Sequence, residues 1–377
     1  MTEAPGLLLT LLAFLFVIGP LVFVHELGHY LVGRWFGVRA DVFAIGFGRE
    51  MFGVTDRRGT RWKFGWLPLG GYVRFAGDMN PASQPDPDWL ALPPEERAQT
   101  FQAKPVWQRA LIVLAGPLTN FLVAIAILAA FAMAIGVNRT PPVVGGLQPG
   151  GVAAAAGFRV GDRVLSVDGR SVDDFTDVAE LVIARPNQAL TFRIERDGRE
   201  QTLIATPAVQ HRTDRFGNKY PFGRLGIASP EPVIERVGVL EAPGVAIAQT
   251  AGIVRMMIDG LGQILSGLRS AQELGGPLRI AQFSGEAASA GPLNLAYLIA
   301  LISINLGFIN LLPVPMLDGG HLLFYGVEAI RRKPVDPAVQ EWAFRSGLLL
   351  LLTLMLFVTI NDLAAFGVWR GLSGLIG

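Results

Sequence analysis

Residues 7–29 read LLLTLLAFLFVIGPLVFVHELGH, an uncharged run followed directly by a short polar motif. The uncharged part, Leu7–Val24, is close to the roughly 20 apolar residues that a helix needs to cross a bilayer. No basic residue precedes it, and no small-residue cleavage site follows it. We therefore expect a retained transmembrane helix rather than a signal peptide.

Three further uncharged runs follow, over Ala110–Val137, Ala287–Leu317 and Ser346–Ile360. The 377-residue chain is 51% hydrophobic and only 17% charged, whereas soluble domains average about 25% charged residues. The predicted fold class is a mainly α polytopic membrane protein with four transmembrane helices, an inserted α+β domain and a small membrane-associated β-hairpin sheet. Its predicted segments are a first transmembrane helix in 1–36, a linker with the hairpin sheet in 37–106, a second transmembrane helix in 107–137, a folded domain in 138–228, an amphipathic segment in 229–286, a third transmembrane helix in 287–318, a linker in 319–344 and a fourth transmembrane helix in 345–370.

The basic residues predict the orientation of these helices. Lys and Arg are frequent in 34–109 and in 331–345, whereas 1–6 has none. The positive-inside rule therefore places both linkers in the cytoplasm and both termini outside. The folded domain at 138–228 is then extracytoplasmic. The run 244–268 is interrupted by polar residues, and a helix lying on the outer membrane surface fits it better than a fifth span.

The composition restricts the chemistry. Net charge is +1, and no basic patch with interleaved aromatic residues indicates a nucleic-acid partner. The chain has no cysteine, so a metal site must use His, Asp or Glu. His25, Glu26 and His29 form an HExxH motif, in which the two imidazoles share one helix face and Glu26 can act as the base. The alternative is a pair of interfacial histidines with Glu26 reaching to the cytoplasm.

A catalytic zinc needs a third protein ligand. The third apolar run ends in NLLPVPMLDGGH at 310–321, where Asp318 is the obvious carboxylate. The orientation places Asp318 at the same membrane depth as the two histidines. His321 is a competing third ligand, but an interfacial or supporting position is the interpretation we favour. Pro313 and Pro315 break the helix, which membranes tolerate around a cavity or a protein-buried site.

HELGH together with NLLPVPMLDGG resembles the site-2 protease family of intramembrane zinc metalloproteases, and most closely its bacterial regulators of the RseP type with one PDZ domain. The resemblance spans nearly the whole chain. It implies one Zn²⁺ per chain held by His25, His29 and Asp318, with Glu26 as the catalytic base. It also implies substrate contacts at Asn310 and the neighbouring Pro313 and Pro315. The stretch GPLTNF at 116–121 is part of the resemblance, and Asn120 has either a site role or a purely structural interhelical one.

Residues 150–169 read GGVAAAAGFRVGDRVLSVDG, which resembles a bacterial, circularly permuted PDZ domain. The resemblance implies a loop that receives a peptide carboxylate through its backbone N–H groups. An ordinary glycine turn is the alternative interpretation for this loop, whose residues are Gly223, Arg224, Leu225, Gly226 and Ile227. Within 38–78, alternating residues predict the β-hairpin sheet, which in the family dips into the membrane near the zinc. Its edge at Gly71, Tyr72 and Val73 is expected to bind an unwound substrate segment by β-addition.

The function that this pattern predicts is regulated intramembrane proteolysis in the bacterial inner membrane. The resemblance implies that the substrates are single-pass membrane proteins, such as anti-sigma factors, already trimmed outside by an upstream site-1 protease. The alternatives are a non-proteolytic PDZ membrane scaffold and a metal-handling membrane protein. An intact Glu26 between the two histidines argues against both, because neither function needs a base at that position.

Overall fold

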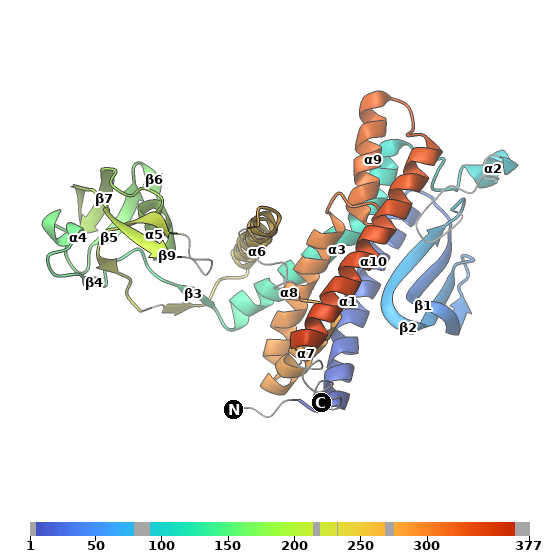
Figure 1. The fold of residues 1–377 in the computed structure, drawn as a ribbon, viewed down its shortest axis with the longest axis horizontal. Coiled ribbons are helices and arrows are strands. Elements are labelled where there is room, and N and C mark those ends of the chain that lie inside the picture. Colours follow the sequence, from blue (N-terminus) through green and yellow to red (C-terminus); the bar gives the residue numbers. More distant parts are fainter. Residues whose placement is uncertain (1–4, 79–90, 214–218, 232, 268–274, 366–377) are drawn as a thin grey trace, which may run out of the picture. The chain divides into compact units, whose positions relative to one another are not determined.

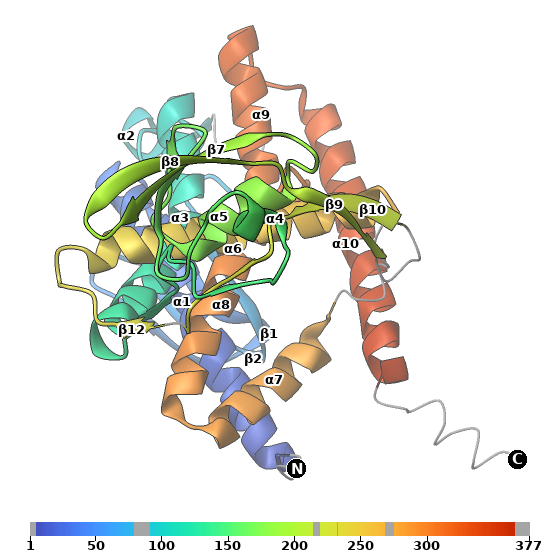
Figure 2. The same ribbon diagram turned by 90° about the vertical axis from the view of Figure 1, so that its left-hand side faces the viewer.

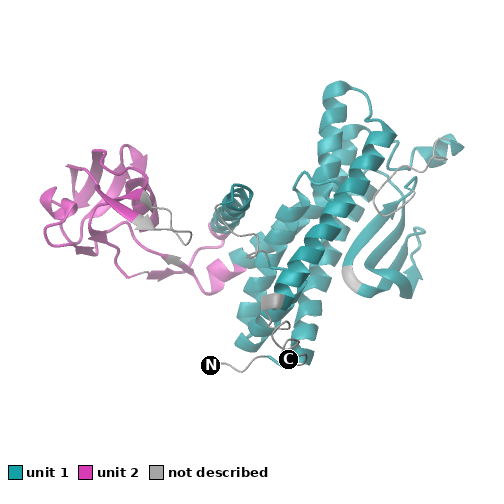
Figure 3. Ribbon diagram, viewed as in Figure 1, with its two compact units in different colours: residues 1–129, 243–377 teal, residues 130–242 magenta. Residues whose placement is uncertain are grey.

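The computed structural model describes residues 5–78, 91–213, 219–231, 233–267 and 275–365. The chain divides into two compact units, which Figure 3 distinguishes by colour. Unit 1 comprises residues 1–129 and 243–377, and unit 2 comprises residues 130–242. The last residues of the predicted fourth helix, 366–370, lie outside the described part of the chain.

Among the residues that the structure describes, four helices are long and apolar enough to span a bilayer, as expected for an integral membrane protein. Each contains all or most of one of the uncharged runs, although the third of them covers only 292–310 of the run 287–317. They are α1 (Leu7–Trp35), α3 (Val106–Ala134), α8 (Pro292–Asn310) and α10 (Pro337–Ala365), which Figure 1 labels. The helix α1 packs against α7 (Pro277–Ala290) and α8 on one side and against the sheet on another.

Small residues let α1 and α3 approach closely. A Cβ atom at Gly28 of α1 would overlap the side chain of Thr119 and the carbonyl of Ala115 on α3. Glycine at such a contact removes the only group that would separate two backbones. Residues Gly28 and Gly116 therefore allow the HELGH turn of α1 to lie directly against α3.

Two long strands, β1 (Ala40–Thr55) and β2 (Arg61–Phe75), form an antiparallel sheet beside α1 (Figure 1). The first part of β1 pairs on both sides, because Phe43 lies opposite both Trp62 and Val73. The strand β2 therefore bends back, and residues 71–75 form an outer edge. Gly46 and Gly70 adopt positive φ of 83° and 85° where the strands bend, a conformation that glycine adopts without strain.

A buried apolar cluster joins this sheet to the helices. Its core contains Phe43 of β1, Val73 and Phe75 of β2, Ile112 of α3 and Tyr30 of α1. Burying five such side chains contributes roughly 1.5–3 kcal/mol each. The edge of β2 is thereby held against the polar turn of α1.

The segment 287–318 differs from the single helix expected there. The helix α7 ends at Ala290, and Gly291 interrupts the chain at a φ of 115° before α8 begins at Pro292. A proline is well suited to the first turn of a helix, where its missing N–H has no partner to lose. After α8 ends at Asn310, residues 311–317 form a non-helical turn.

Residues 319–344 also differ from the linker expected there. The helix α9 (Asp318–Arg331) begins at Asp318, and α10 begins at Pro337. The helices α9 and α10 run side by side in opposite directions, as Figure 2 shows, and the rings of His321 and Phe344 lie 4.9 Å apart between them. The Asp318 carboxylate therefore occupies the first turn of a new helix rather than the end of the third span.

The buried carboxylate of Asp362 connects α10 to α7. It is fully buried, accepts hydrogen bonds from the backbone N–H groups of Gly276 and Arg279, and forms an ion pair of 3.3 Å with the Arg279 side chain. The first N–H groups of a helix lack intrahelical partners, and a carboxylate satisfies them well. Asp362 thus caps α7 from a different helix.

Unit 2 is an α+β body with its own core, built around Phe192, Val164, Ile194 and Val178. Four strands pair in the order β6-β5-β7-β8, and α5 carries a capping box at Asp174 and Asp177. The bounds of its elements are β3 (Val137–Arg139), β4 (Gly146–Leu147), α4 (Val152–Ala155), β5 (Arg163–Val167), β6 (Arg170–Ser171), α5 (Phe175–Ile183), β7 (Leu190–Arg196), β8 (Arg199–Ala205), β9 (Ala208–Thr213), β10 (Lys219–Arg224), β11 (Ile227–Ala228) and β12 (Val233–Glu235).

Two helices complete the described chain. A short helix, α2 (Pro94–Arg97), precedes α3. The helix α6 (Ala242–Leu265) lies in the segment predicted to be amphipathic and has exposed Ile247, Met256, Ile258 and Leu265.

Candidate metal centre

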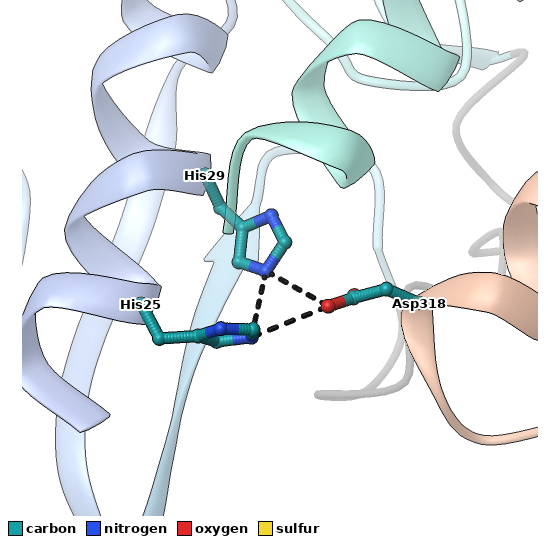
Figure 4. A group of neighbouring side chains, drawn as sticks. All are labelled: His25, His29 and Asp318. Atoms are coloured by element: carbon teal, nitrogen blue, oxygen red, sulfur yellow. Dashed lines mark hydrogen bonds and ion pairs between the residues drawn. The ribbon is translucent and has the colours of Figure 1, made fainter. Parts of the chain in front are cut away.

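The two imidazoles of the HELGH motif come from successive turns of α1. Residues four apart lie on the same face of a helix, so both rings project in one direction. The Nε2 atoms of His25 and His29 are 3.3 Å apart, and the rings are nearly perpendicular (Figure 4). His25 is 7% exposed, which makes this a buried pair of polar rings in an otherwise apolar helix.

Asp318 adds a carboxylate from the start of α9. Its Oδ2 atom lies 3.2 Å from His25 Nε2 and 3.5 Å from His29 Nε2, so three potential ligand atoms form a triangle (Figure 4). Together these residues are a group that could hold a metal ion. Residues nearly 300 positions apart in the sequence meet here because the turn after α8 directs the chain back toward α1.

The geometry of the triangle fits zinc. Bonds of 2.0–2.1 Å in a tetrahedral site place neighbouring ligand atoms about 3.3–3.4 Å apart. The three observed separations are 3.2, 3.3 and 3.5 Å. The buried Asp318 Oδ2 also has no hydrogen-bond donor among the described residues. Two imidazoles and one carboxylate leave a fourth position open, as catalytic zinc sites require.

The helix α3 contacts the other side of both imidazoles. His29 Nδ1 lies 2.9 Å from the carbonyl oxygen of Ile112, which can only accept a hydrogen bond. The Nδ1 atom of His29 therefore carries a proton, which leaves Nε2 as the ring nitrogen that can bind a metal. On the other imidazole, His25 Nδ1 lies 3.0 Å from the side-chain amide of Asn120.

Glu26 lies between the metal-binding candidates and the sheet. Its side chain is almost completely buried, and its carboxylate accepts a hydrogen bond from the backbone of Val73 on β2. A Cβ atom added to Gly71 would lie 2.9 Å from Glu26 Cγ, so the strand is in direct contact with this side chain. The outer edge of β2 thus positions the only carboxylate of the HExxH motif.

A cavity of about 200 Å³ unites most of the predicted site residues. It is lined by His25, Glu26, His29, Gly71, Tyr72, Val73, Asn310, Asp318 and His321, together with apolar side chains. His321 lies outside the three-residue metal group, and burial lowers the pKa of its imidazole despite the nearby Asp318 carboxylate. Pro313 and Pro315 do not line this cavity. Pro315 lies against the backbone of Gly320 and Gly347 instead.

Sequence reasoning did not single out Met316 or the Ile112 carbonyl, which both contribute to this site. Met316 lines it and adopts a φ of 82°, an uncommon conformation for a residue with a side chain. Strained residues of this kind concentrate at functional sites. The Ile112 carbonyl is the other contributor, and no sequence pattern marks a backbone acceptor. The proximity of Met316 to Asp318 in the sequence is the one signal that was available.

The predicted carboxylate loop lies in unit 2, in a separate cavity of about 330 Å³. Gly223, Arg224, Leu225, Gly226 and Ile227 line one side of it. The helix α5 lines the other side through Phe175, Ala179, Val182 and Ile183. The groove is thus mainly apolar and has a strand on one side and a helix on the other.

The family model and the related proteins that this chain resembles agree on one family of metalloproteases. Residues 13–354 match the model of peptidase family M50. A protein of Rhizobium meliloti whose name describes a zinc metalloprotease is 46% identical, with 94% of this chain and 96% of the relative covered. Metalloprotease MmpA of Caulobacter vibrioides is 39% identical over 98% of this chain and 99% of its own length. The PDZ domain of an SdrC-like protein from Listeria monocytogenes covers 25% of this chain and 90% of its own, at 13% identity and a TM-score of 0.19, which is too low to show a shared fold.

Proposed function

The chain belongs to peptidase family M50 and is a membrane zinc metalloprotease, and on this premise we propose that it cleaves peptide bonds inside the transmembrane segments of single-pass membrane proteins. Membership of a peptidase family favours proteolysis over the two alternative functions, a membrane scaffold and a metal-handling protein. The observation that carries the proposal is the triangle of His25, His29 and Asp318, buried beside Glu26 in apolar helices.

We assign the zinc to the two imidazoles and the Asp318 carboxylate. A zinc ion held by these three residues would supply Lewis-acid chemistry for the scissile carbonyl and the attacking water. Glu26 takes a proton from the attacking water and delivers it to the nitrogen of the leaving amine. The Val73 hydrogen bond keeps its carboxylate facing the cavity during both transfers.

Aromatic side chains support an intramembrane location of this chemistry. Trp35 ends α1, Trp107 begins α3 and Trp342 lies near the start of α10, and all three are exposed. Tryptophan is enriched at the boundary between bilayer and water. At 1.5 Å per residue, His29 lies about 9 Å along α1 from Trp35. Cleavage then occurs within the cytoplasmic half of the bilayer.

The edge of β2 is the proposed binding site for the substrate backbone. A helix must unwind before its peptide bond can reach a nucleophile, and an unwound segment can pair with a strand edge. Gly71, Tyr72 and Val73 line the cavity next to Glu26, and Asn310 faces them from the end of α8. We assign Gly71, Tyr72 and Val73 to the substrate backbone and Asn310 to the substrate side chains. Proline at Tyr72 or Val73 should abolish cleavage, and unchanged cleavage would contradict this assignment.

Unit 2 is proposed to be a PDZ domain that controls access from outside the cell membrane. Its apolar groove lies between the helix α5 and the strand β10, and a peptide could add to such a strand edge by β-augmentation. In this arrangement both termini and unit 2 are extracytoplasmic, in the inner membrane of a bacterium. The substrates, of which anti-sigma factors are the type we expect, arrive after an upstream site-1 protease has shortened them.

The test is cleavage of a tagged single-pass substrate in proteoliposomes, with zinc content determined on the same samples. Glu26→Gln should retain zinc and lose cleavage by about 10²-fold or more, because general-base catalysis contributes about 10²–10⁴-fold. Asp318→Ala should lose both zinc and cleavage. An Asp318→Ala variant with full zinc and activity would disprove the ligand assignment and make His321 the next candidate.

A further inference from the structure

Asn120 is a fully buried polar residue in the middle of the apolar helix α3. Its backbone carbonyl accepts a hydrogen bond of 2.8 Å from Ser303 on α8, while its side chain lies 3.0 Å from His25 Nδ1. The side chain and the backbone thus have different partners on different helices. The side-chain Oδ1 is buried and has no hydrogen-bond partner among the described residues.

The role of the side chain follows from the protonation of His25. A neutral imidazole carries one proton, either on Nδ1 or on Nε2. His25 Nε2 points at Asp318 and His29, so it can bind a metal only when the proton is on Nδ1. An Nδ1–H group buried in apolar surroundings needs an acceptor. Rotation of the Asn120 carboxamide by 180° brings its oxygen to that position, since the two amide atoms are interchangeable in this way.

We propose that Asn120 is the positioning residue of His25, with its carboxamide oxygen accepting the hydrogen bond from Nδ1–H. It thereby holds the Nε2 lone pair toward the metal, as the Ile112 carbonyl does for His29. One helix, α3, then determines the tautomer of both imidazoles. Partners of this kind orient metal-bound histidines and raise their basicity. This inference rests on the proposed ligand set, in which His25 is a zinc ligand.

A purely structural role predicts something different. If Asn120 only joins α3 to its neighbours, removal of the Ser303 hydroxyl should have a similar effect to removal of the Asn120 amide. Ser303→Ala removes the contact to the Asn120 backbone and leaves the contact to His25 intact. It is therefore the matched control. Asn120→Asp provides the conservative variant, because a carboxylate can accept from Nδ1–H as an amide oxygen does.

The experiment measures zinc affinity of the full-length protein in detergent by competition with chelators of graded strength. Asn120→Leu should weaken zinc binding by roughly 10- to 100-fold. Asn120→Asp should bind zinc within a few-fold of wild type, and Ser303→Ala should be unchanged. The thermal unfolding temperature of each metal-free variant is measured in parallel. A variant that unfolds at a lower temperature than the metal-free wild type loses affinity through misfolding. Asn120→Ala replaces the leucine variant if that one does not fold.

Two outcomes separate the failure of this proposal from the failure of the ligand assignment. His25→Ala is included, and it should lose zinc. Wild-type affinity in Asn120→Leu together with loss of zinc in His25→Ala would overturn the positioning role alone. Zinc retained by His25→Ala would overturn the ligand set on which the role rests. Equal weakening in Asn120→Leu, Asn120→Asp and Ser303→Ala would assign Asn120 a structural role instead.

Discussion

Gly116 shows how closely single residues determine this metal centre. It lies on α3, directly against the His29 imidazole, and an added Cβ atom would overlap His29 Nε2. The same helix places the Ile112 carbonyl on the opposite ring nitrogen. The helix α3 therefore contacts both nitrogen atoms of the His29 ring. The gap between this ring and Gly116 is too small for a methyl group.

Gly116→Ala should accordingly displace the His29 ring and reduce zinc content. Alanine stabilises a helix relative to glycine by roughly 0.5–1 kcal/mol. A loss of zinc in this variant therefore cannot come from a weaker α3 helix. Zinc bound per chain and peptide cleavage should fall together. Gly19→Ala is the matched control, because nothing lies within 4 Å of a Cβ atom there. Full zinc content in Gly116→Ala would show that α1 can move away from α3.

At the residue scale the sequence was informative because the ligand motifs are local. HELGH places two imidazoles on one helix face by spacing alone, and the Asp318 carboxylate follows from the need for a third ligand. The positions of Asn120 and Ile112 could not be obtained in this way. Asn120 was singled out by the resemblance of GPLTNF and as a polar residue at depth, which left a site role and a structural role open, and a backbone carbonyl such as that of Ile112 has no signature in the side-chain sequence.

At the scale of elements, hydropathy located the apolar runs but not their internal breaks. The run 287–317 has no charge, so its composition alone predicts one long helix. The structure instead has α7, the turn at Gly291, α8 and the non-helical residues 311–317. Gly291, with its positive φ, ends α7, and Pro292 begins α8. Neither residue is charged, so a hydropathy profile does not show this break. Packing of α7 against α1 and α10, which a single sequence does not reveal, decides between the two outcomes.

Asp362 is expected to hold α7 and α10 together. Asp362→Ala removes a buried carboxylate that accepts from Gly276 and Arg279 and leaves Arg279 without its ion pair. The Arg279 side chain is partly exposed and can be solvated, so the main cost is that of backbone N–H groups left without an acceptor, about 1–3 kcal/mol for each one that is buried. The thermal unfolding temperature in detergent should therefore fall, whereas Thr353→Ala, an exposed position on the same helix, should leave it nearly unchanged.

A double variant tests whether the two charges act as one unit. Arg279→Ala in the Asp362→Ala background should add little, because residues in one ion pair are not independent. Additive losses from the two single changes would mean that Asp362 acts only through the α7 backbone. Zinc content should stay at the wild-type level throughout, since neither residue touches the metal cavity.

At the scale of the whole molecule, the chain combines an apolar helical unit with a folded α+β unit. The sequence changes from uncharged runs to short alternating segments near residue 138, which predicts a separate folded domain from that point. The unit extends further, over residues 130–242, since β3 pairs with β12 and so joins the two ends of the insertion. Strands of three residues carry too little periodicity to be found from sequence. The groove between α5 and β10 was likewise visible in the sequence only as a glycine-containing loop.

Unit 2 should lose stability in acid, and Asp162 should be one cause. Burial alone would raise the pKa of its carboxyl, but hydrogen bonds from the Arg196 side chain and the Arg159 backbone N–H hold that pKa below its ordinary value. The unfolded chain, with an aspartate pKa of about 3.9, then binds protons more readily than the folded chain. The stabilisation is complete above about pH 5 and is lost as the pH falls through the folded-state pKa.

Hydrogen-exchange protection factors for β5 and β7 of the full-length protein provide the measurement, because they are corrected for the pH dependence of intrinsic exchange. Protection should be constant between pH 7 and about pH 5 and decrease below about pH 4. Asp162→Asn should lower protection at pH 7 and flatten the acid decrease, so that the two proteins converge at low pH. Asp173→Asn, which changes an exposed carboxyl of the same unit, should follow the wild-type curve. An acid decrease that stays equally steep in Asp162→Asn would assign the effect to other carboxyls, of which Asp174 is the first candidate because its pKa is also lowered by backbone hydrogen bonds that outweigh its burial.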